Sequence, residues 1–151
     1  MLLFLQEFHN RQIDSIELDK FKGRFKEDLK YRNKVTEFIM VYNESFVDVE
    51  KSKMFARLFG AHISGHFDWR HFRHLSSCLH DLKYEGISFL TKLSTENFEV
   101  PEDRPKGAPE RDFDKEAVLS AAGIAFTAGA WSSGFYVTDA GKDLYRHGVV
   151  E

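Results

Sequence analysis

VLSAAGI at residues 118–124 and YVTDAGKDL at residues 136–144 are the two stretches that decide the fold. The first predicts a helix that Gly123 ends, because glycine favours the left-handed backbone found at the C-terminus of many helices. The second predicts a strand that runs directly into a helix. Thr138 is the expected N-cap of that helix, since a threonine hydroxyl accepts hydrogen bonds from backbone N–H groups of the first turn.

A β-hairpin is expected between these two stretches. Residues 124–127 (IAFT) and 134–137 (GFYV) are rich in β-prone residues and flank a turn of small residues, which predicts two antiparallel strands. Gly141 has no side chain, so the last helix can approach the hairpin closely. The C-terminal part of the chain is therefore expected to be a small unit of helices and strands.

Residues 136–144 resemble the sequence Y-x-L-T-x-x-G-x-x-L that follows the wing of many bacterial winged-helix regulators, with Val137 in place of the usual leucine. The middle of the chain is similar to a loose group of bacterial proteins of unknown function, in which helices precede a winged-helix-like end. The residues that support this second similarity are EKSKMFARL at 50–58, ISG at 63–65, DW at 68–69, Phe72 and Leu75. The resemblance covers roughly residues 45–95 and 115–148, and it implies a fold rather than an activity.

Helical spacing of apolar residues dominates the first two thirds of the chain. A short helical segment is expected at residues 2–9. No proline interrupts residues 16–45, where apolar side chains recur every three or four residues as on one face of a helix. This region predicts a single helix of about 45 Å, at roughly 1.5 Å per residue.

Three further helices are expected before residue 95. Asp48 is the expected N-cap of the first, which ends at Ser64-Gly65, and Asp68 is the expected N-cap of the second. A break at residues 84–86 precedes a short third helix. Residues 94–112 hold all three prolines and many charges, which predicts a loop or linker.

The predicted fold class is mainly α (α+β), with a long N-terminal helix, a helical middle and a small C-terminal winged-helix-like unit that contains a β-hairpin. The last helix is expected to stop at Gly148. The expected regions are an N-terminal helical (oligomerisation) region at 1–46, a helical middle at 47–95, a loop or linker at 96–112 and the C-terminal unit at 113–151.

Composition excludes several classes of protein. The chain has 151 residues, of which 42% are hydrophobic and 15 are Phe, so global disorder is excluded. A single cysteine, Cys78, excludes an internal disulfide framework and favours a cytoplasmic location. No apolar run approaches the roughly 18 to 20 residues that span a bilayer, so no membrane span is expected. The familiar signatures of phosphate-binding loops, zinc proteases and serine hydrolases are absent, so we expect no enzymatic activity and no cofactor.

The helix expected to begin near Trp69 has a possible metal site. His71, His74 and Cys78 lie at i, i+3 and i+7, a spacing that sets three possible zinc or nickel ligands on one face. The pattern matches no metal signature, and a histidine beside an apolar stripe often packs its ring against the core. A lone cysteine is by default a small buried hydrophobe. We therefore expect no metal.

Four lysines form a possible site for anions or nucleic acid. Lys22, Lys26, Lys30 and Lys34 recur every four residues, so they would lie on one side of a single helix. Such a ridge can meet phosphates or an acidic partner. The alternative, which we favour, is a solvated face that keeps the protein in solution.

The C-terminal unit lacks the cations that a DNA reader needs. The helix expected at residues 114–122 would enter the major groove if the winged unit bound DNA, and Lys115 is its only cation. The wing at residues 125–135 has no Arg or Lys but has an aromatic residue, Trp131, suited to a protein contact. Residues 96–151 hold 6 basic and 11 acidic side chains. We therefore favour a non-enzymatic protein-interaction or oligomerisation module, and a DNA-binding protein similar to transcription regulators is the alternative.

A homodimer is expected through the N-terminal helices. One helix cannot bury both halves of its apolar stripe against a small C-terminal unit. Each Phe left in water forfeits about 2 kcal/mol, and two-fold association is the commonest way to cover such a face. The residues predicted in this interface are Leu18, Phe21, Phe25 and Leu29. The identity of any other partner protein stays open.

Overall fold

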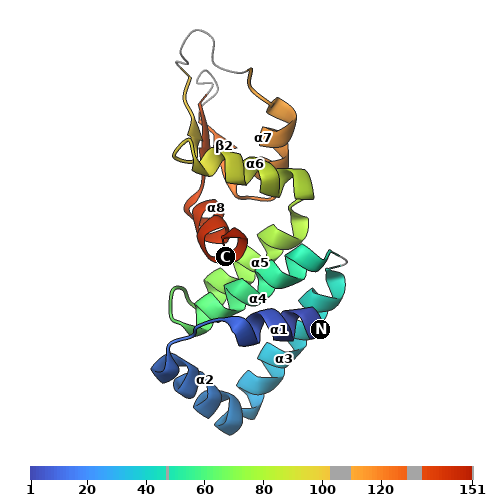
Figure 1. The fold of residues 1–151 in the computed structure, drawn as a ribbon, viewed down its shortest axis with the longest axis vertical. Helices are drawn as coiled ribbons and strands as arrows, with labels where there is room; N and C mark the ends of the chain where they lie inside the picture. The colour runs from blue at the N-terminus through green and yellow to red at the C-terminus, as the bar shows by residue number, and fades with distance from the viewer. Residues whose placement is uncertain (47, 103–109, 129–133, 151) are drawn as a thin grey trace. The chain divides into compact units, whose positions relative to one another are not determined.

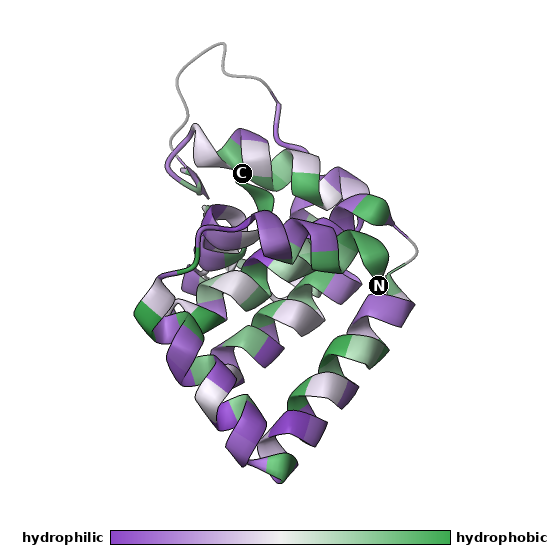
Figure 2. Ribbon diagram, turned by 60° about the horizontal axis from the view of Figure 1, so that its bottom comes forward, coloured by the Kyte–Doolittle hydropathy of each residue, from purple (hydrophilic) through white to green (hydrophobic). Residues whose placement is uncertain are grey.

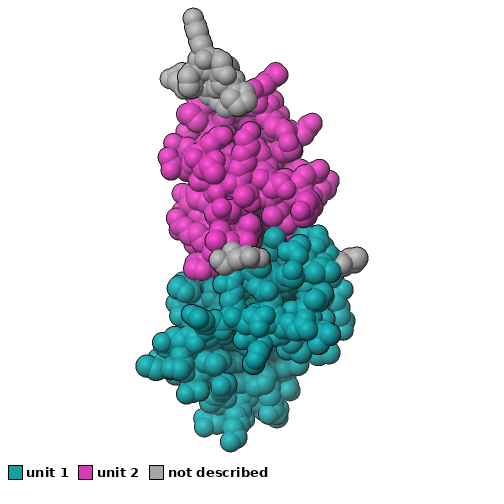
Figure 3. Space-filling model, viewed as in Figure 1, with its two compact units in different colours: residues 1–76 teal, residues 77–151 magenta. Residues whose placement is uncertain are grey.

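The computed structural model describes residues 1–46, 48–102, 110–128 and 134–150 (Figure 1). The chain forms two compact units, residues 1–76 and 77–151, which Figure 3 colours teal and magenta. The predicted class, mainly α with a small β component, is confirmed.

The secondary-structure elements of unit 1 are all helices within its described residues. Its elements are α1 (Leu2–Asn10), α2 (Ser15–Glu27), α3 (Leu29–Ser45), α4 (Val49–Ile63) and the first turns of α5 (Trp69–Asp81). In Figure 2 these helices show both hydrophobic and hydrophilic residues along their length, as expected for helices with one face in a core.

The single long helix predicted over residues 16–45 is wrong, because the chain breaks at Asp28. Asp28 has φ −99° and ψ 97°, outside the helical region. Its backbone N–H still donates to the Arg24 carbonyl at 2.9 Å, and its carboxylate accepts from the Tyr31 N–H at 2.9 Å. Aspartate competes for backbone N–H groups in this way and favours caps over helix interiors. One residue therefore ends α2 and begins α3, and the two helices form a V in Figure 1.

Phe55 on α4 lies at the centre of the unit 1 core and is fully buried. Its ring centroid lies 5.5 Å from that of Phe4 on α1 and 5.6 Å from that of Phe72 on α5. An ion pair adds to the attachment of α1, since Nε of the buried Arg57 lies 2.7 Å from Oε1 of Glu7. Aromatic packing and one charge pair therefore hold α1 against α4.

The predicted caps of α4 and α5 are confirmed. The Asp48 carboxylate accepts from the Glu50 N–H at 2.8 Å, and the Asp68 carboxylate accepts from the His71 N–H at 2.8 Å. Gly65 has φ +80°, the left-handed conformation expected at the end of α4.

Unit 2 consists of helices around a three-stranded antiparallel sheet. Its elements are the end of α5, α6 (Tyr84–Ser94), β1 (Glu99–Val100), α7 (Phe113–Ala121), β2 (Ala125–Thr127), β3 (Phe135–Val137), α8 (Asp139–Leu144) and the π-helical turn η1 (Tyr145–Val149). The strand order is β1-β3-β2. The predicted hairpin of β2 and β3 is confirmed, with Phe126 opposite Tyr136.

β1 lies inside the segment predicted to be a loop or linker at 96–112, so that prediction is wrong at residues 99–100. Val100 pairs with Phe135 and is buried. The Val137 N–H also donates to the Phe98 carbonyl at 2.9 Å. Burial of the Val100 side chain and its pairing with Phe135 both favour a strand at this position, although Pro101 follows directly. Residues 103–109 of the same segment lie outside the described residues.

Three of the predicted element boundaries involve glycines. Gly123 has φ +75° and ends α7 as expected. The helical conformation continues through Gly148 as η1, because that glycine does not adopt the left-handed conformation that would stop it. The break predicted at residues 84–86 lies earlier, at Leu82 and Lys83, since α5 ends at Asp81 and α6 begins at Tyr84. Gly86 lies inside α6, where a Cβ atom would come within 2.9 Å of Val118.

The last helix is capped and packed as predicted. The Gly141 N–H donates to the Thr138 hydroxyl at 3.1 Å. A Cβ atom on Gly141 would lie 2.5 Å from Cγ1 of Val137 and would also meet the carbonyl oxygen of Ile124. The absence of a side chain at residue 141 therefore allows α8 to contact the hairpin.

Candidate functional site

An apolar cavity of about 310 Å³ lies in unit 1 among α1, α2, α3 and α4. Its walls are apolar except for one threonine. The lining residues are Met1, Phe4, Leu5, Phe21, Phe25, Val35, Thr36, Ile39, Met40 and Phe59.

The break at Asp28 explains how α2 contributes to this cavity. It allows α2 to turn back so that Phe21 packs edge-on against Phe59 of α4, with ring centroids 5.7 Å apart. Phe21 also lies 5.5 Å from Phe25. Both rings are half-buried. A continuous helix would have carried α3 away from α2 instead of beside it.

The rim of the cavity is unusually apolar for a surface. Met1 is 48% exposed, Leu5 51% and Met40 44%, and Val41 beside them is 58% exposed. Single exposed apolar residues are ordinary, whereas a group of them around an apolar cavity is typical of an interaction surface. We call Met1, Leu5, Phe25, Met40 and Val41 the apolar face.

A second depression, of about 650 Å³, runs along the outer surface of α3. Phe25, Thr36 and Met40 line both this depression and the apolar cavity. The remaining lining residues are Arg32, Asn33, Glu37, Val41 and Glu44. The apolar face therefore continues into a surface that has charges of both signs.

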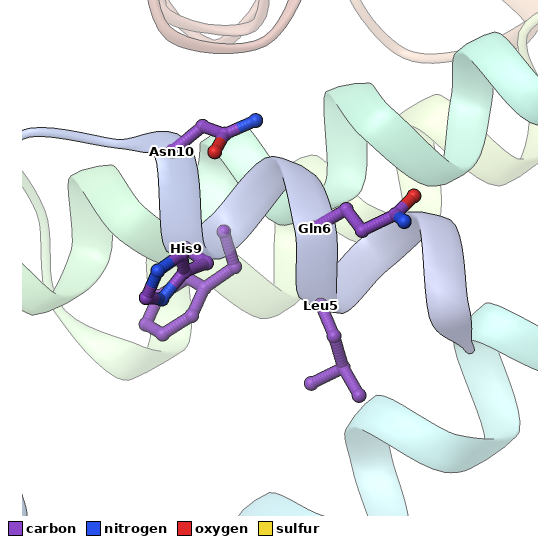
Figure 4. A pocket seen from close by; sticks show the side chains of 5 residues that line it. Leu5, Gln6, His9 and Asn10 are labelled. Carbon is purple, nitrogen blue, oxygen red and sulfur yellow. The ribbon is translucent and has the colours of Figure 1, made fainter.

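A third depression, of about 680 Å³, lies along α1 and is lined by Leu5, Gln6, Phe8, His9 and Asn10. Figure 4 shows Leu5 and Asn10 extending to opposite sides of the helix. The lining offers one titratable group, the exposed His9. A lone exposed imidazole supplies no arrangement for catalysis, and Leu5 links this surface to the apolar face.

The four residues predicted in a dimer interface are divided between two helices. Phe21 and Phe25 line the cavity, and Leu18 is half-buried on the same helix. Leu29 belongs to α3 and is 57% exposed. The sequence therefore identified Phe21 and Phe25 at this site and missed Met1, Leu5 and Met40. The apolar run at residues 1–5 was the available signal for the first two.

The predicted lysine ridge does not exist on one helix. Lys22 and Lys26 belong to α2, whereas Lys30 and Lys34 belong to α3 beyond the break. Nζ of Lys34 lies 5.7 Å from the ring centroid of Trp69, and Nζ of Lys22 lies 3.8 Å from Oδ1 of Asp19. The break at Asp28 removes the regular spacing on which the ridge depended.

His71, His74 and Cys78 all lie on α5, as predicted. The rings of His71 and His74 are 6.4 Å apart. Within residues 1–46, 48–102, 110–128 and 134–150, no three His, Cys, Asp or Glu side chains converge as a metal site requires. Cys78 is buried, and burial raises the pKa of its thiol to about 11, which disfavours the thiolate that binds metals.

The cations near α7 are paired with carboxylates of the same region. Nε of Arg111 donates to Oε1 of the buried Glu116 at 2.9 Å, and Nζ of Lys115 lies 2.6 Å from Oδ2 of Asp112. The Glu116 carboxylate raises the pKa of Arg111, and Lys115 lowers the pKa of Asp112. Trp131, the aromatic residue expected at the hairpin tip, lies outside the described residues.

Comparison with protein-family models, curated proteins and solved structures found no match to this chain. Among the helices of the described residues, none is both long and apolar enough to cross a bilayer.

Proposed function

We propose that this protein is a non-enzymatic interaction module that forms a homodimer through the apolar face of unit 1. The observation that supports this function is the group of exposed apolar side chains, Met1, Leu5 and Met40, around an apolar cavity. Water in contact with such a face is released when a second surface covers it.

The energetics require several of these residues to act together. Full burial of a Leu or Met side chain is worth about 1.5 to 3 kcal/mol. Association costs roughly 4 to 15 kcal/mol in lost translational and rotational freedom. One exposed side chain therefore cannot hold a dimer, whereas the five members of the apolar face on each of two subunits can together reach that range.

We further propose that unit 2 is winged-helix-like and acts in assembly rather than in DNA recognition. Its order of helix, hairpin and capped helix supports the first part of this proposal. The pairing of Arg111 and Lys115 with Glu116 and Asp112 supports the second, because a cation engaged within the protein must break that pair to meet a phosphate.

Light scattering or sedimentation equilibrium at micromolar concentration tests the dimer. The expected mass is twice that of the 17.5 kDa chain. Met40→Asp should shift the equilibrium toward monomer by at least about tenfold in dissociation constant, because it sets a charge in the buried part of the interface. Met40 is 44% exposed, so this variant is expected to fold.

Val49→Asp is the matched control, since Val49 is 47% exposed on the same unit and lies outside the cavity lining. It should leave the dimer unchanged. A monomer at high concentration would refute the proposal. So would a Met40→Asp variant that dimerises as tightly as the parent.

A further inference from the structure

We infer that two copies of the chain pair through α3 in antiparallel orientation, with Arg32 facing Glu44 of the partner subunit. This inference rests on the proposed homodimer and adds the surface, the register and the charge pairs that define it. It draws on the depression along α3, whose charges the apolar face does not explain.

Residues of α3 that line this depression form a regular ridge. Arg32, Thr36, Met40 and Glu44 recur every four residues, which is the spacing of the ridges that interdigitate in the commonest class of helix packing. Thr36 is small and Met40 is flexible, so a ridge of this kind can accept a matching ridge. The spacing of these residues is therefore suited to packing against a second helix.

Charge is distributed unevenly along the same ridge. A basic side chain, Arg32, lies toward the N-terminal end, and an acidic one, Glu44, lies at the C-terminal end. Exposed apolar side chains, Met40 and Val41, lie between them. Among the described residues, Arg32, Glu37 and Glu44 have no ion-pair partner within the chain. Their charges are thus available to a partner.

Of the two orientations, the antiparallel one makes the charged ends of this ridge complementary to each other. A parallel pair would set Arg32 against Arg32 and Glu44 against Glu44, which is repulsive. Reversing one helix sets each Arg32 against Glu44 of the partner subunit, and it also aligns the helix dipoles favourably. Because the dimer has a two-fold axis, the Arg32–Glu44 pair occurs twice, once in each direction across the interface.

The register follows from the same residues. The pairs Arg32–Glu44 and Thr36–Met40 have position 38 as their common midpoint, so one axis satisfies both. In this register the partner's Met40 lies over Thr36, which also lines the apolar cavity. The pairing therefore covers part of the apolar face, in agreement with the proposed function.

A charge-swap experiment tests the pairing. Sedimentation equilibrium at low salt is measured for the parent, Arg32→Glu, Glu44→Arg and the double variant, with circular dichroism to verify folding. Each single reversal creates two like-charge contacts per dimer, so the dissociation constant should rise at least about tenfold, or about 1.4 kcal/mol. The double variant restores opposite charges and should return to within about threefold of the parent.

Lys26→Glu is the control, because it makes the same change of charge at an exposed site on α2 and should have little effect. A dimer that withstands both single reversals would overturn the antiparallel α3 pairing but leave the proposed dimer intact. Single variants that weaken the dimer without recovery in the double variant would also overturn the pairing. A parent protein that stays monomeric would refute the proposed function itself.

Discussion

Cys78 shows how burial controls the chemistry of a single side chain. Its pKa is raised to about 11, first by burial and then by the nearby Asp81. The thiolate is the reactive form, so at pH 8 the folded protein has about 100-fold less of it than a thiol with the reference pKa of 9.0. We expect iodoacetamide to modify the native protein at least about tenfold more slowly than the urea-unfolded protein. Equal rates would contradict the buried thiol.

His62 makes the stability of unit 1 depend on pH. Its Nδ1 lies 3.0 Å from the Phe67 carbonyl oxygen, and its ring stacks on that of Phe72 at 5.6 Å. Burial lowers the pKa of His62 below the ordinary value of 6.5. Below pH 6.5 the unfolded chain therefore binds the proton more readily than the folded chain, and the free energy of unfolding falls until the folded pKa is passed.

Urea unfolding at pH 7.5 and pH 5.5 measures this dependence. The parent should be less stable at the lower pH, and His62→Gln should lose that part of the difference because glutamine does not titrate. If the variant retains the whole pH dependence, other groups cause it.

Gly141 and Gly23 both lie in helices but differ in the space around them. A Cβ at residue 141 would clash with Val137 and with the Ile124 carbonyl oxygen, whereas a Cβ at residue 23 would meet nothing within 4 Å. Gly141→Ala should destabilise the protein by about 1 to 3 kcal/mol through overpacking. Gly23→Ala should stabilise it by about 0.5 to 1 kcal/mol, since alanine has the higher helix propensity. Denaturant unfolding of both variants checks the opposite signs.

At the scale of elements, the cap at Asp28 decides the path of the N-terminal helices. Its carboxylate accepts from the Tyr31 N–H, and its side chain is exposed. Asp28→Ala removes the cap and should cost about 1 kcal/mol of stability. Asp28→Asn retains an acceptor oxygen and should cost much less. Chemical denaturation of the two variants separates the cap from the charge, and equal losses would show that the charge matters instead.

The same break changes the amount of apolar surface available to a partner. In one continuous helix, Phe21 and Phe25 would need a second chain to cover them. In the structure, Phe21 packs on Phe59 of its own unit, so the Phe21 ring is partly covered within the chain. The exposed apolar residues beside the cavity include Met1, Leu5, Met40 and Val41, and the proposed interface moves accordingly toward α1 and α3.

At the scale of the whole molecule, charge predicts weak binding to random DNA duplex. The net charge is −3, and the cations beside α7 are paired with carboxylates. A mobility-shift assay at low salt should show no binding below about micromolar concentration, which is typical of nonspecific contacts. Submicromolar, salt-sensitive binding that is lost in the triple variant Lys22→Glu, Lys26→Glu, Lys30→Glu would instead favour a DNA-binding function.

Local patterns in the sequence were sufficient to determine much of this fold. The caps at Asp48, Asp68 and Thr138 and the turns at Gly65 and Gly123 were predicted from residue type alone. They could be predicted because each depends on backbone groups within a few residues, and the hairpin of β2 and β3 likewise follows from local β propensity.

Only the tertiary structure decided the features that depend on distant residues. The apolar periodicity continues past Asp28 to Leu29 in the sequence, yet the helix ends at Asp28, where the carboxylate caps α3 and the break places Phe21 beside Phe59. β1 became a strand because Val100 found β3 as its partner. The apolar cavity combines residues from four helices, and no local sequence pattern indicates which faces of those helices contact one another. Long-range packing overrides local propensity where the two differ, and they differ at Val100, which pairs in β1 within a segment predicted to be a loop.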